Sequence, residues 1–350
     1  RLSNVAALAI LASDALSSVA YATEEILLTL MVAGSGVLGI SLPIAGAIVL
    51  LLAIVILSYR QTIRAYPNGG GAYIVVRENL GIYPGLVAGA ALLIDYILTV
   101  TVSVSAGIAA LTSAFPALTP WGVDLCLLAV FLLMWANLRG VKEAGRIFMV
   151  PTYAFIVCIF LLIGAGLLKQ VMGNIPSLPQ SLPTGSESLS LFLILRAFAA
   201  GCTALTGVEA ISDGVLVFKV PEWKNARRTL LYLGTILGMM FLGITYLVHV
   251  YHIVPTHGQT VVSLLGRQVF GNGTLYYFLQ GATLLILLLA ANTSYSDFPR
   301  LGYFLARDGF LPRQLSLLGD RLVYANGIRL LSLAAAFLII IFQGQVSALI

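Results

Sequence analysis

The chain has 350 residues, of which 59% are hydrophobic and 9% are charged, and its net charge is +5. The charged share is roughly a third of the ~25% that is usual in soluble domains, and the mean hydropathy is +1.00. This composition excludes a soluble globular domain, a disordered chain and a nucleic-acid-binding protein. It favours an all-α polytopic membrane protein, because the apolar runs lack the alternation of barrel strands.

Nine segments are apolar enough to span a bilayer, which takes about 20 mostly apolar residues. In chain order they are 5–33, 39–63, 84–113, 121–138, 147–169, 190–217, 228–254, 274–304 and 327–349. The longest polar stretch, 170–189, contains three prolines and is predicted to be an external loop. We expect one transmembrane transport domain over residues 1–350, with the lipid bilayer around it.

Two of these spans are interrupted. The polar run 13–18 lies in the first span, and the glycine-flanked run 201–207 lies in the sixth. Transporters built from two inverted five-span halves commonly open each half with such a discontinuous helix. The sequence therefore predicts a 5+5 inverted repeat, with a first repeat over about 1–170 and a second over about 186–350. The second repeat is incomplete after the ninth span, and because the chain begins at Arg1 we expect a piece of a longer protein.

Basic residues predict the orientation, because they gather in cytoplasmic loops. Only Lys169 and Arg267 fall on one side of the predicted membrane, and Arg196 falls within a span. The other side holds Arg1, Arg60, Arg64, Arg77, Arg139, Lys142, Arg146, Lys219, Lys224, Arg227, Arg228, Arg300, Arg307, Arg313, Arg321 and Arg329. We therefore expect a multi-pass protein of the cell membrane with a cytoplasmic N-terminus.

Acidic residues inside the spans are the candidates for function. Most of the acids fall in loops or near span ends, and Asp297 is placed near the inner end of the eighth span. Five stand apart: Asp14, Glu24, Asp95, Glu209 and Asp213. A carboxylate at a helix centre costs on the order of 2.5–3.5 kcal/mol and usually marks a polar pathway. A structural salt bridge or a helix-end hydrogen bond is the alternative for each of them.

Hydroxyl groups accompany these acids. Tyr96, Thr99 and Ser103 share one helix face beside Asp95. Tyr21 follows Asp14 in the first span, and Thr206 precedes Glu209 in the sixth. Oxygen ligands and unwound backbone carbonyls suit a hard cation. The histidines lie elsewhere, so zinc and copper are not expected, and the alternative for any hydroxyl is a bond to its own helix.

Three acids have other expected places. Glu24 lies ten residues after Asp14, about 15 Å along a helix. We therefore predict that Glu24 and Glu25 line an outer entrance. Asp213 lies near the cytoplasmic end of the sixth span, where a gate or a helix-end role is expected.

Several motifs resemble those of one superfamily. They are the run 66–73 with its Pro-x-x-Gly-Gly-x-Tyr pattern, 207–210 leading into 218–221, and 291–294 with 297–300 and 307–312. Together they are similar to the amino acid–polyamine–organocation superfamily over essentially the whole chain. The resemblance implies a LeuT-like fold with broken first and sixth spans.

The first break then bears on the substrate. Amino-acid permeases of that superfamily typically hold a carboxylate at a glycine-rich break, whereas this break has no glycine and carries Asp14. The run 13–25 looks more like the KimA-type potassium importers of the KUP family. That resemblance implies a potassium path through Asp14, Tyr21, Asp95, Tyr96, Thr99, Ser103 and Thr206. It also implies proton coupling, a homodimer, and a tenth span with a regulatory region beyond residue 350.

The leading hypothesis is a proton-coupled potassium importer that works by alternating access. Glu209 is the expected proton carrier, because a low-dielectric site favours the neutral carboxyl group. Transported potassium ions and protons are the only small partners expected, with no cofactor. A proton- or cation-coupled permease for amino acids or cationic metabolites on the same fold is the alternative, and a passive channel remains open. An enzyme is not expected, because no nucleophile or carboxylate is paired with a histidine at the same depth.

Overall fold

The computed structural model describes residues 1–67, 71–140, 145–173, 188–256, 258–319 and 324–350. Within these ranges the chain forms α-helices and short 3-10 helices, with no β-strand beyond isolated bridges. Residues 68–70 of the glycine-rich motif, the predicted cytoplasmic residues Lys142 and Arg321, and most of the predicted loop 170–189 lie outside the described residues.

Seven helical stretches of the described chain are long and apolar enough to cross a membrane. They are Ser35–Ala65, Ile82–Ala114, Pro116–Leu138, Phe148–Val171, Leu191–Asp213, Glu222–Val250 and Thr274–Arg307. A bent pair, Asn4–Leu11 and Ser13–Met31, makes an eighth span if its two parts are counted together. The predicted all-α, polytopic architecture is confirmed.

The predicted ninth span, 327–349, was wrong in its extent. Helix α14 runs over Ala325–Ile341, and a separate short helix, α15, covers Val346–Leu349. The backbone between them turns at Gln343 and Gly344, whose φ angles are 53° and 66°. Left-handed residues end a helix, because a right-handed helix needs negative φ at every position. Apolar composition alone does not reveal that turn.

The first span is bent where its polar run begins. Ser3 caps helix α1 (Asn4–Leu11) by accepting a hydrogen bond from the Ala6 N–H, at 3.3 Å. Ala12 leaves the helical conformation, and the short helix α2 (Ser13–Ser17) and a 3-10 turn, Ser18–Ala20, follow. Helix α3 (Ala22–Met31) completes the second part of the span, Ser13–Met31, which is bent by 61° from α1. The predicted interruption is therefore a true break in the helix.

The sixth span is also broken. Helix α9 (Leu191–Gly201) passes into a 3-10 turn, Cys202–Leu205, and helix α10 covers only Ala210–Asp213. Gly207 lies between them with a φ angle of 76°, a backbone conformation that glycine adopts without strain. A last 3-10 turn, Val215–Val217, ends the span.

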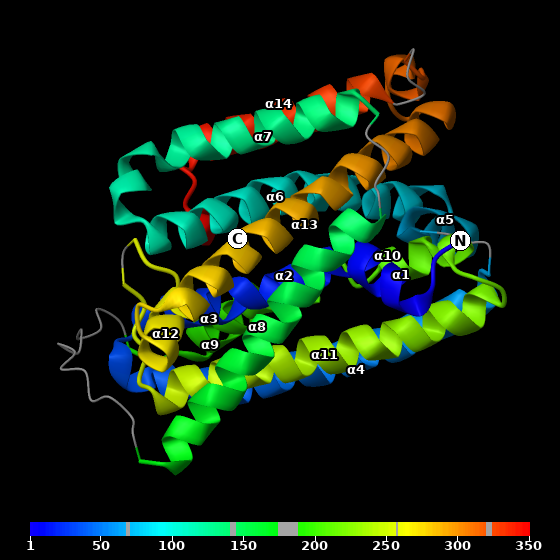
Figure 1. Cartoon of the computed structure of the whole chain (residues 1–350). Coiled ribbons are helices and arrows are strands. Elements are labelled where there is room, and N and C mark those ends of the chain that lie inside the picture. Colours follow the sequence, from blue (N-terminus) through cyan, green and yellow to red (C-terminus); the bar gives the residue numbers. More distant parts are fainter. Residues whose placement is uncertain (68–70, 141–144, 174–187, 257, 320–323) are drawn as a thin grey trace.

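Two hydrophobic clusters organise the bundle. One joins the broken spans to α4 (Ser41–Ala65), α8 (Gly145–Val171) and α11 (Glu222–Val250). The other joins α7 (Gly122–Leu138) and α14 to α6 (Ile82–Ala114) and α13 (Thr274–Arg307), which pack lengthwise against each other. Figure 1 shows α12 (Val261–Phe270) at one end of the bundle, and α5 (Gly71–Leu80) with the N-terminus at the opposite end. We call these the α12 end and the α5 end.

Candidate functional site

Asp14 lies at the bend of the first span, against the break of the sixth. Its side chain is buried, and its Oδ1 atom has no hydrogen-bond partner among the described residues. A Cβ atom placed on Gly207 would lie 2.6 Å from Asp14 Oδ2 and 2.9 Å from the Ala15 nitrogen. The two breaks therefore meet so closely that only a glycine fits between them. An unpaired buried carboxylate oxygen at this junction is suited to a cation.

Hydroxyl groups join the two breaks. The Tyr21 phenol lies near the Thr206 side chain, and the Thr206 hydroxyl donates to the Thr203 carbonyl of its own segment at 2.9 Å. Ser18 donates to the Ala15 carbonyl at 2.6 Å and reaches the Ala204 carbonyl of the other break at 3.4 Å. Ser17 donates to the Asp14 carbonyl at 2.7 Å. Ser17 thus bonds to its own segment, as the alternative for it stated, while Ser18 bonds to its own segment and also to the other break.

The third contributor is a buried face of α6. Tyr96, Thr99 and Ser103 lie on it with 9%, 8% and 0% of their surface exposed. Ser103 Oγ has no hydrogen-bond partner among the described residues, whereas Thr101 donates to the Ile97 carbonyl of its own helix at 2.8 Å. The Ser103 hydroxyl is therefore available on the buried face of α6, whereas the Thr101 hydroxyl is bonded to its own helix.

The acids from four helices lie within electrostatic range of one another. Asp14 interacts with Asp95 and Asp297, and Glu209 interacts with Asp14, Asp95 and Asp213. The charged partners of Asp14 and Glu209 are all negative, whereas Asp213 also lies within electrostatic range of the Arg300 guanidinium. Such a concentration of negative charge inside a membrane protein favours a cation in the space between the acids.

Sequence reasoning missed two members of this region, Asp297 and Tyr59. Asp297 was placed near the end of its span, but α13 continues for ten more residues, to Arg307. The available signal was the spacing of Thr293, Asp297 and Arg300, which puts all three on one helix face and lines one cavity with them. Tyr59 of α4 lies within electrostatic range of Glu209, Asp213 and Asp95.

Two cavities lie between this acidic region and the α5 end. The larger, of about 520 Å³, is lined by Tyr96 together with residues of α5, α10 and α13. The second, of about 300 Å³, reaches the first residues of the chain at Leu2. Asp213, Asp297 and Arg300 line both cavities. Asp213, expected to be a gate or helix-end residue, therefore lines the route from Tyr96 to the α5 end.

Glu24 and Glu25 lie on α3, away from the Asp14 junction. Glu24 Oε2 accepts a hydrogen bond from the Val261 backbone N–H at 2.9 Å, at the start of α12. Glu25 is 3% exposed. The structure therefore places these two acids away from Asp14, although Glu24 lines a small cavity together with Tyr21 and Glu25 lies within electrostatic range of Tyr21.

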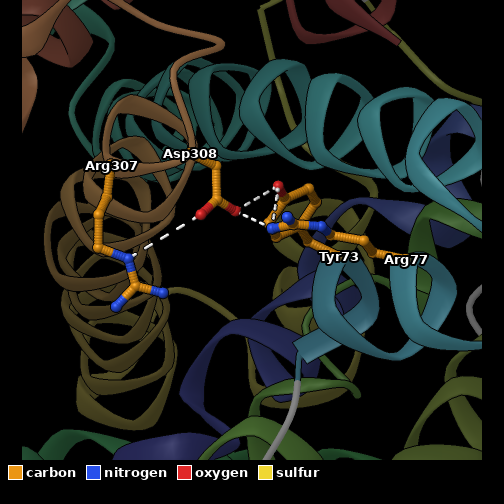
Figure 2. Close-up of polar contacts among 4 residues, drawn as sticks. All are labelled: Tyr73, Arg77, Arg307 and Asp308. Atoms are coloured by element: carbon orange, nitrogen blue, oxygen red, sulfur yellow. Dashed lines mark hydrogen bonds and ion pairs between the residues drawn. The ribbon is translucent and has the colours of Figure 1, made fainter.

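A polar cluster fastens α5 to the end of α13 (Figure 2). Asp308 Oδ2 accepts hydrogen bonds from the Tyr73 hydroxyl, at 2.8 Å, and from the Arg77 guanidinium. Arg307 Nε lies 3.9 Å from the other carboxylate oxygen. Burial, and then the hydrogen bond to Asp308, raise the Tyr73 pKa above its usual value. Because Tyr73 also lines the larger cavity, the Asp308 cluster sets one wall of that cavity.

Comparison with known proteins identifies the family. A family model described as amino acid permease matches residues 2–350. The chain belongs to the amino acid permease family. The resemblances predicted from the motifs are confirmed, and the permease is not an enzyme.

Two curated relatives of this permease are informative. The potassium transporter KimA of Bacillus subtilis (strain 168) is 50% identical along 100% of the chain, which spans 58% of that relative. The low-affinity putrescine importer PlaP of Escherichia coli (strain K12) is 22% identical along 73% of the chain, which spans 57% of it. The permease thus covers somewhat more than half of the length of these relatives.

The candidate site of this permease is built from oxygen atoms. Its candidate ligands are carboxylate, phenol and hydroxyl oxygens, supplied by two broken helices and one continuous helix. Hard cations take such ligands, and unwound helix segments can add backbone carbonyls. The site chemistry therefore fits an alkali cation as transported substrate.

Proposed function

We propose that this permease imports potassium ions across the cell membrane by proton-coupled alternating access. The observation that carries the proposal is the buried junction of the two broken spans, where Asp14 has an unpaired oxygen beside Gly207. The 50% identity to the potassium transporter KimA supports potassium as the ion. A LeuT-like inverted repeat and a homodimer, both implied by the family resemblance, belong to the same proposal.

In this proposal each group has one role. Potassium binds at Tyr96, Thr99, Ser103 and Thr206, and Asp14, Tyr21 and Asp95 supply negative charge and further oxygens. Glu209 carries the proton, because it faces Asp14, Asp95 and Asp213 and its neutral form relieves the repulsion among them. Ions leave through the two cavities lined by Asp213, Asp297 and Arg300.

The orientation of import follows from the charges. Arg77 lies on α5, and Arg60 and Arg64 lie in the last two turns of α4, the helix that precedes α5, whereas Arg267 lies on α12. Basic residues favour the cytoplasmic side. The α5 end and the N-terminus are therefore cytoplasmic in the proposal, and the α12 end is outside.

Rubidium or potassium uptake into proteoliposomes tests the proposal. We expect Asp14→Asn, Glu209→Gln and Tyr96→Phe each to lower uptake at least tenfold, with Asp124→Asn as the control. Asp124 lies in the first turn of α7, outside the acidic region. Normal uptake by all three site variants would disprove the site assignment. Uptake that ignores an imposed proton gradient would argue for a passive channel.

A second candidate function is the permeation of an organic cation or an amino acid. The larger cavity, at about 520 Å³, lies within the size range of small-molecule sites. The relative PlaP is named as a putrescine importer. Uptake measured side by side with rubidium, sodium, putrescine and amino acids separates the two functions. Uptake of putrescine or an amino acid without rubidium uptake would favour this second function.

A further inference from the structure

The space around the candidate site is unequal at the two ends of the bundle. Toward the α5 end lie the cavities of about 520 and 300 Å³. Toward the α12 end, the cavity next to Tyr21 measures only about 20 Å³, roughly the space of one water molecule. Tyr21, Glu24, Ala109 and Thr260 are among its lining residues. Among the cavities that the described residues line, those toward α5 are therefore wide and the one beside Tyr21 at the α12 end is narrow.

The start of α12 lines one side of this small cavity. Glu24, which lies on the first span, is hydrogen-bonded to that start. Thr260 is the N-cap residue of α12 and uses its own side chain to accept from Ser263 N–H at 3.3 Å. The Val261 N–H, which has no partner within the helix, donates instead to Glu24 Oε2 at 2.9 Å. One carboxylate of the first span thus completes the cap of a helix that lies over the cavity.

The remaining polar contacts of α12 lead to other helices. The Thr260 N–H donates to Ser113 Oγ of α6 at 3.0 Å, and Arg267 Nη2 donates to the Ser113 carbonyl at 2.6 Å. Ser263 is hydrogen-bonded to Tyr276 of α13 at 2.7 Å. Lys169 Nζ of α8 donates to the Gln268 carbonyl at 3.5 Å, so these contacts fasten α12 to α6, α8 and α13. Among the described residues, the Glu24–Val261 bond is the polar contact by which α12 is tied to α3.

We propose that Glu24 is a positioning residue that latches α12 over the small cavity, and that this bond breaks whenever the site opens at the α12 end. The inference rests on the alternating access proposed above, because a site reached from both ends must at some point open here. A bond present in one state and absent in the other shifts the balance between them. Removing it therefore favours the state open at α12.

Access of a thiol reagent from outside measures this opening. The three native cysteines, Cys126, Cys158 and Cys202, are replaced by alanine. Ala109→Cys then places one thiol in the lining of the small cavity. A membrane-impermeant methanethiosulfonate, which is too large for that cavity, is added to right-side-out vesicles, and the labelling rate is recorded. Labelling after denaturation gives the total amount of protein.

The latch can be broken from either side. Glu24→Ala removes the acceptor. Val261→Pro removes the N–H donor, and proline is well tolerated at the first position of a helix. The residue before it, Thr260, already has extended backbone, with φ −72° and ψ 150°. Val261→Ala controls for the lost side chain, and Asp124→Ala for the loss of a carboxylate elsewhere.

We expect Glu24→Ala and Val261→Pro each to speed labelling about tenfold, as the loss of a hydrogen bond to a charged group would. The double variant should be no faster than either single variant, because both remove the same bond. Both controls should label at the parent rate. A parent-like rate in Val261→Pro would overturn the latch, even if Glu24→Ala failed to fold.

Rubidium uptake by the same vesicles keeps this inference separate from the proposed function. Faster labelling without rubidium uptake in the parent would contradict potassium import and leave the latch standing. Normal rubidium uptake in the parent, with unchanged labelling in both latch variants, would contradict the latch and leave potassium import standing.

Discussion

Gly207 shows at the scale of one residue how the candidate site is built. Its positive φ angle turns the sixth span, and its missing side chain lets that turn approach Asp14 and Ala15. Both requirements meet at a single position, so the broken helix and the buried carboxylate depend on the same glycine. An added methyl group would compete directly with an ion for the space beside the Asp14 carboxylate.

We expect Gly207→Ala to lower rubidium uptake more than tenfold. The left-handed backbone costs a non-glycine residue roughly 1–2 kcal/mol, and the new Cβ would lie 2.6 Å from Asp14 Oδ2. Gly46→Ala in α4 is the matched control, because a Cβ there meets nothing within 4 Å. Uptake is measured per amount of protein in the membrane. If Gly207→Ala transports like Gly46→Ala, Gly207 does not border the ion path.

Helix α5 is the element that links the candidate site to its surroundings at the N-terminal end. Its first residues line the larger cavity, and Tyr73 and Arg77 on it share one oxygen of Asp308. A charged acceptor that serves two donors makes a stronger tie than a neutral one. The position of α5, and with it the width of the cavity, therefore depends on Asp308 at the end of α13.

Tyr73→Phe should lower the free energy of unfolding by about 1.5–3 kcal/mol, the usual contribution of a hydrogen bond to a charged group. Thermal unfolding in detergent measures this, with Tyr83→Phe, at a side chain that is 84% exposed, as the control. Because the Tyr73 pKa is raised in the folded protein, its contribution is complete below about pH 10, the ordinary tyrosine value. The difference between parent and variant should shrink as the pH rises through the folded pKa. A difference that grows with alkaline pH would contradict this account.

The two breaks were predictable at the element scale because polar and small residues inside an apolar run are visible in the sequence. The extent of α14 was not, since its end depends on the left-handed backbone at Gln343, a residue that has no special preference for it. Asp297 was placed near the inner end of the eighth span, and the sequence alone did not show that α13 brings it into electrostatic range of Asp14. Which hydroxyl groups are free depends on side-chain direction, and composition does not encode it.

At the scale of the whole molecule, the basic residues and the large cavities are found toward the same end of the bundle, the α5 end. The basic residues gather at the end toward which the large cavities lead. With the α5 end in the cytoplasm, as proposed from the basic residues, this conformation faces inward. The predicted orientation can be tested without any transport measurement.

Single cysteines at the two ends provide that test. In a cysteine-free background, Gly273→Cys, in the turn before α13, should react with an impermeant reagent applied to intact cells. Glu78→Cys, on α5, should react only after the cells are permeabilised. Both positions are exposed, so accessibility reports the side of the membrane and not burial. Labelling of Glu78→Cys in intact cells, with Gly273→Cys labelled only after permeabilisation, would contradict the proposed orientation and the direction of import drawn from it.

The unequal cavities also determine from which end of the bundle an inhibitor could enter. A blocking compound larger than a water molecule finds no room beside Tyr21 from the α12 end, where about 20 Å³ is free. From the other end it meets a chamber of about 520 Å³ with apolar walls, two carboxylates and the Arg300 guanidinium. With the α5 end in the cytoplasm, as proposed, drug-like inhibitors of this conformation would have to cross the cell envelope first, and weakly basic, membrane-permeant molecules are the natural starting point for a screen.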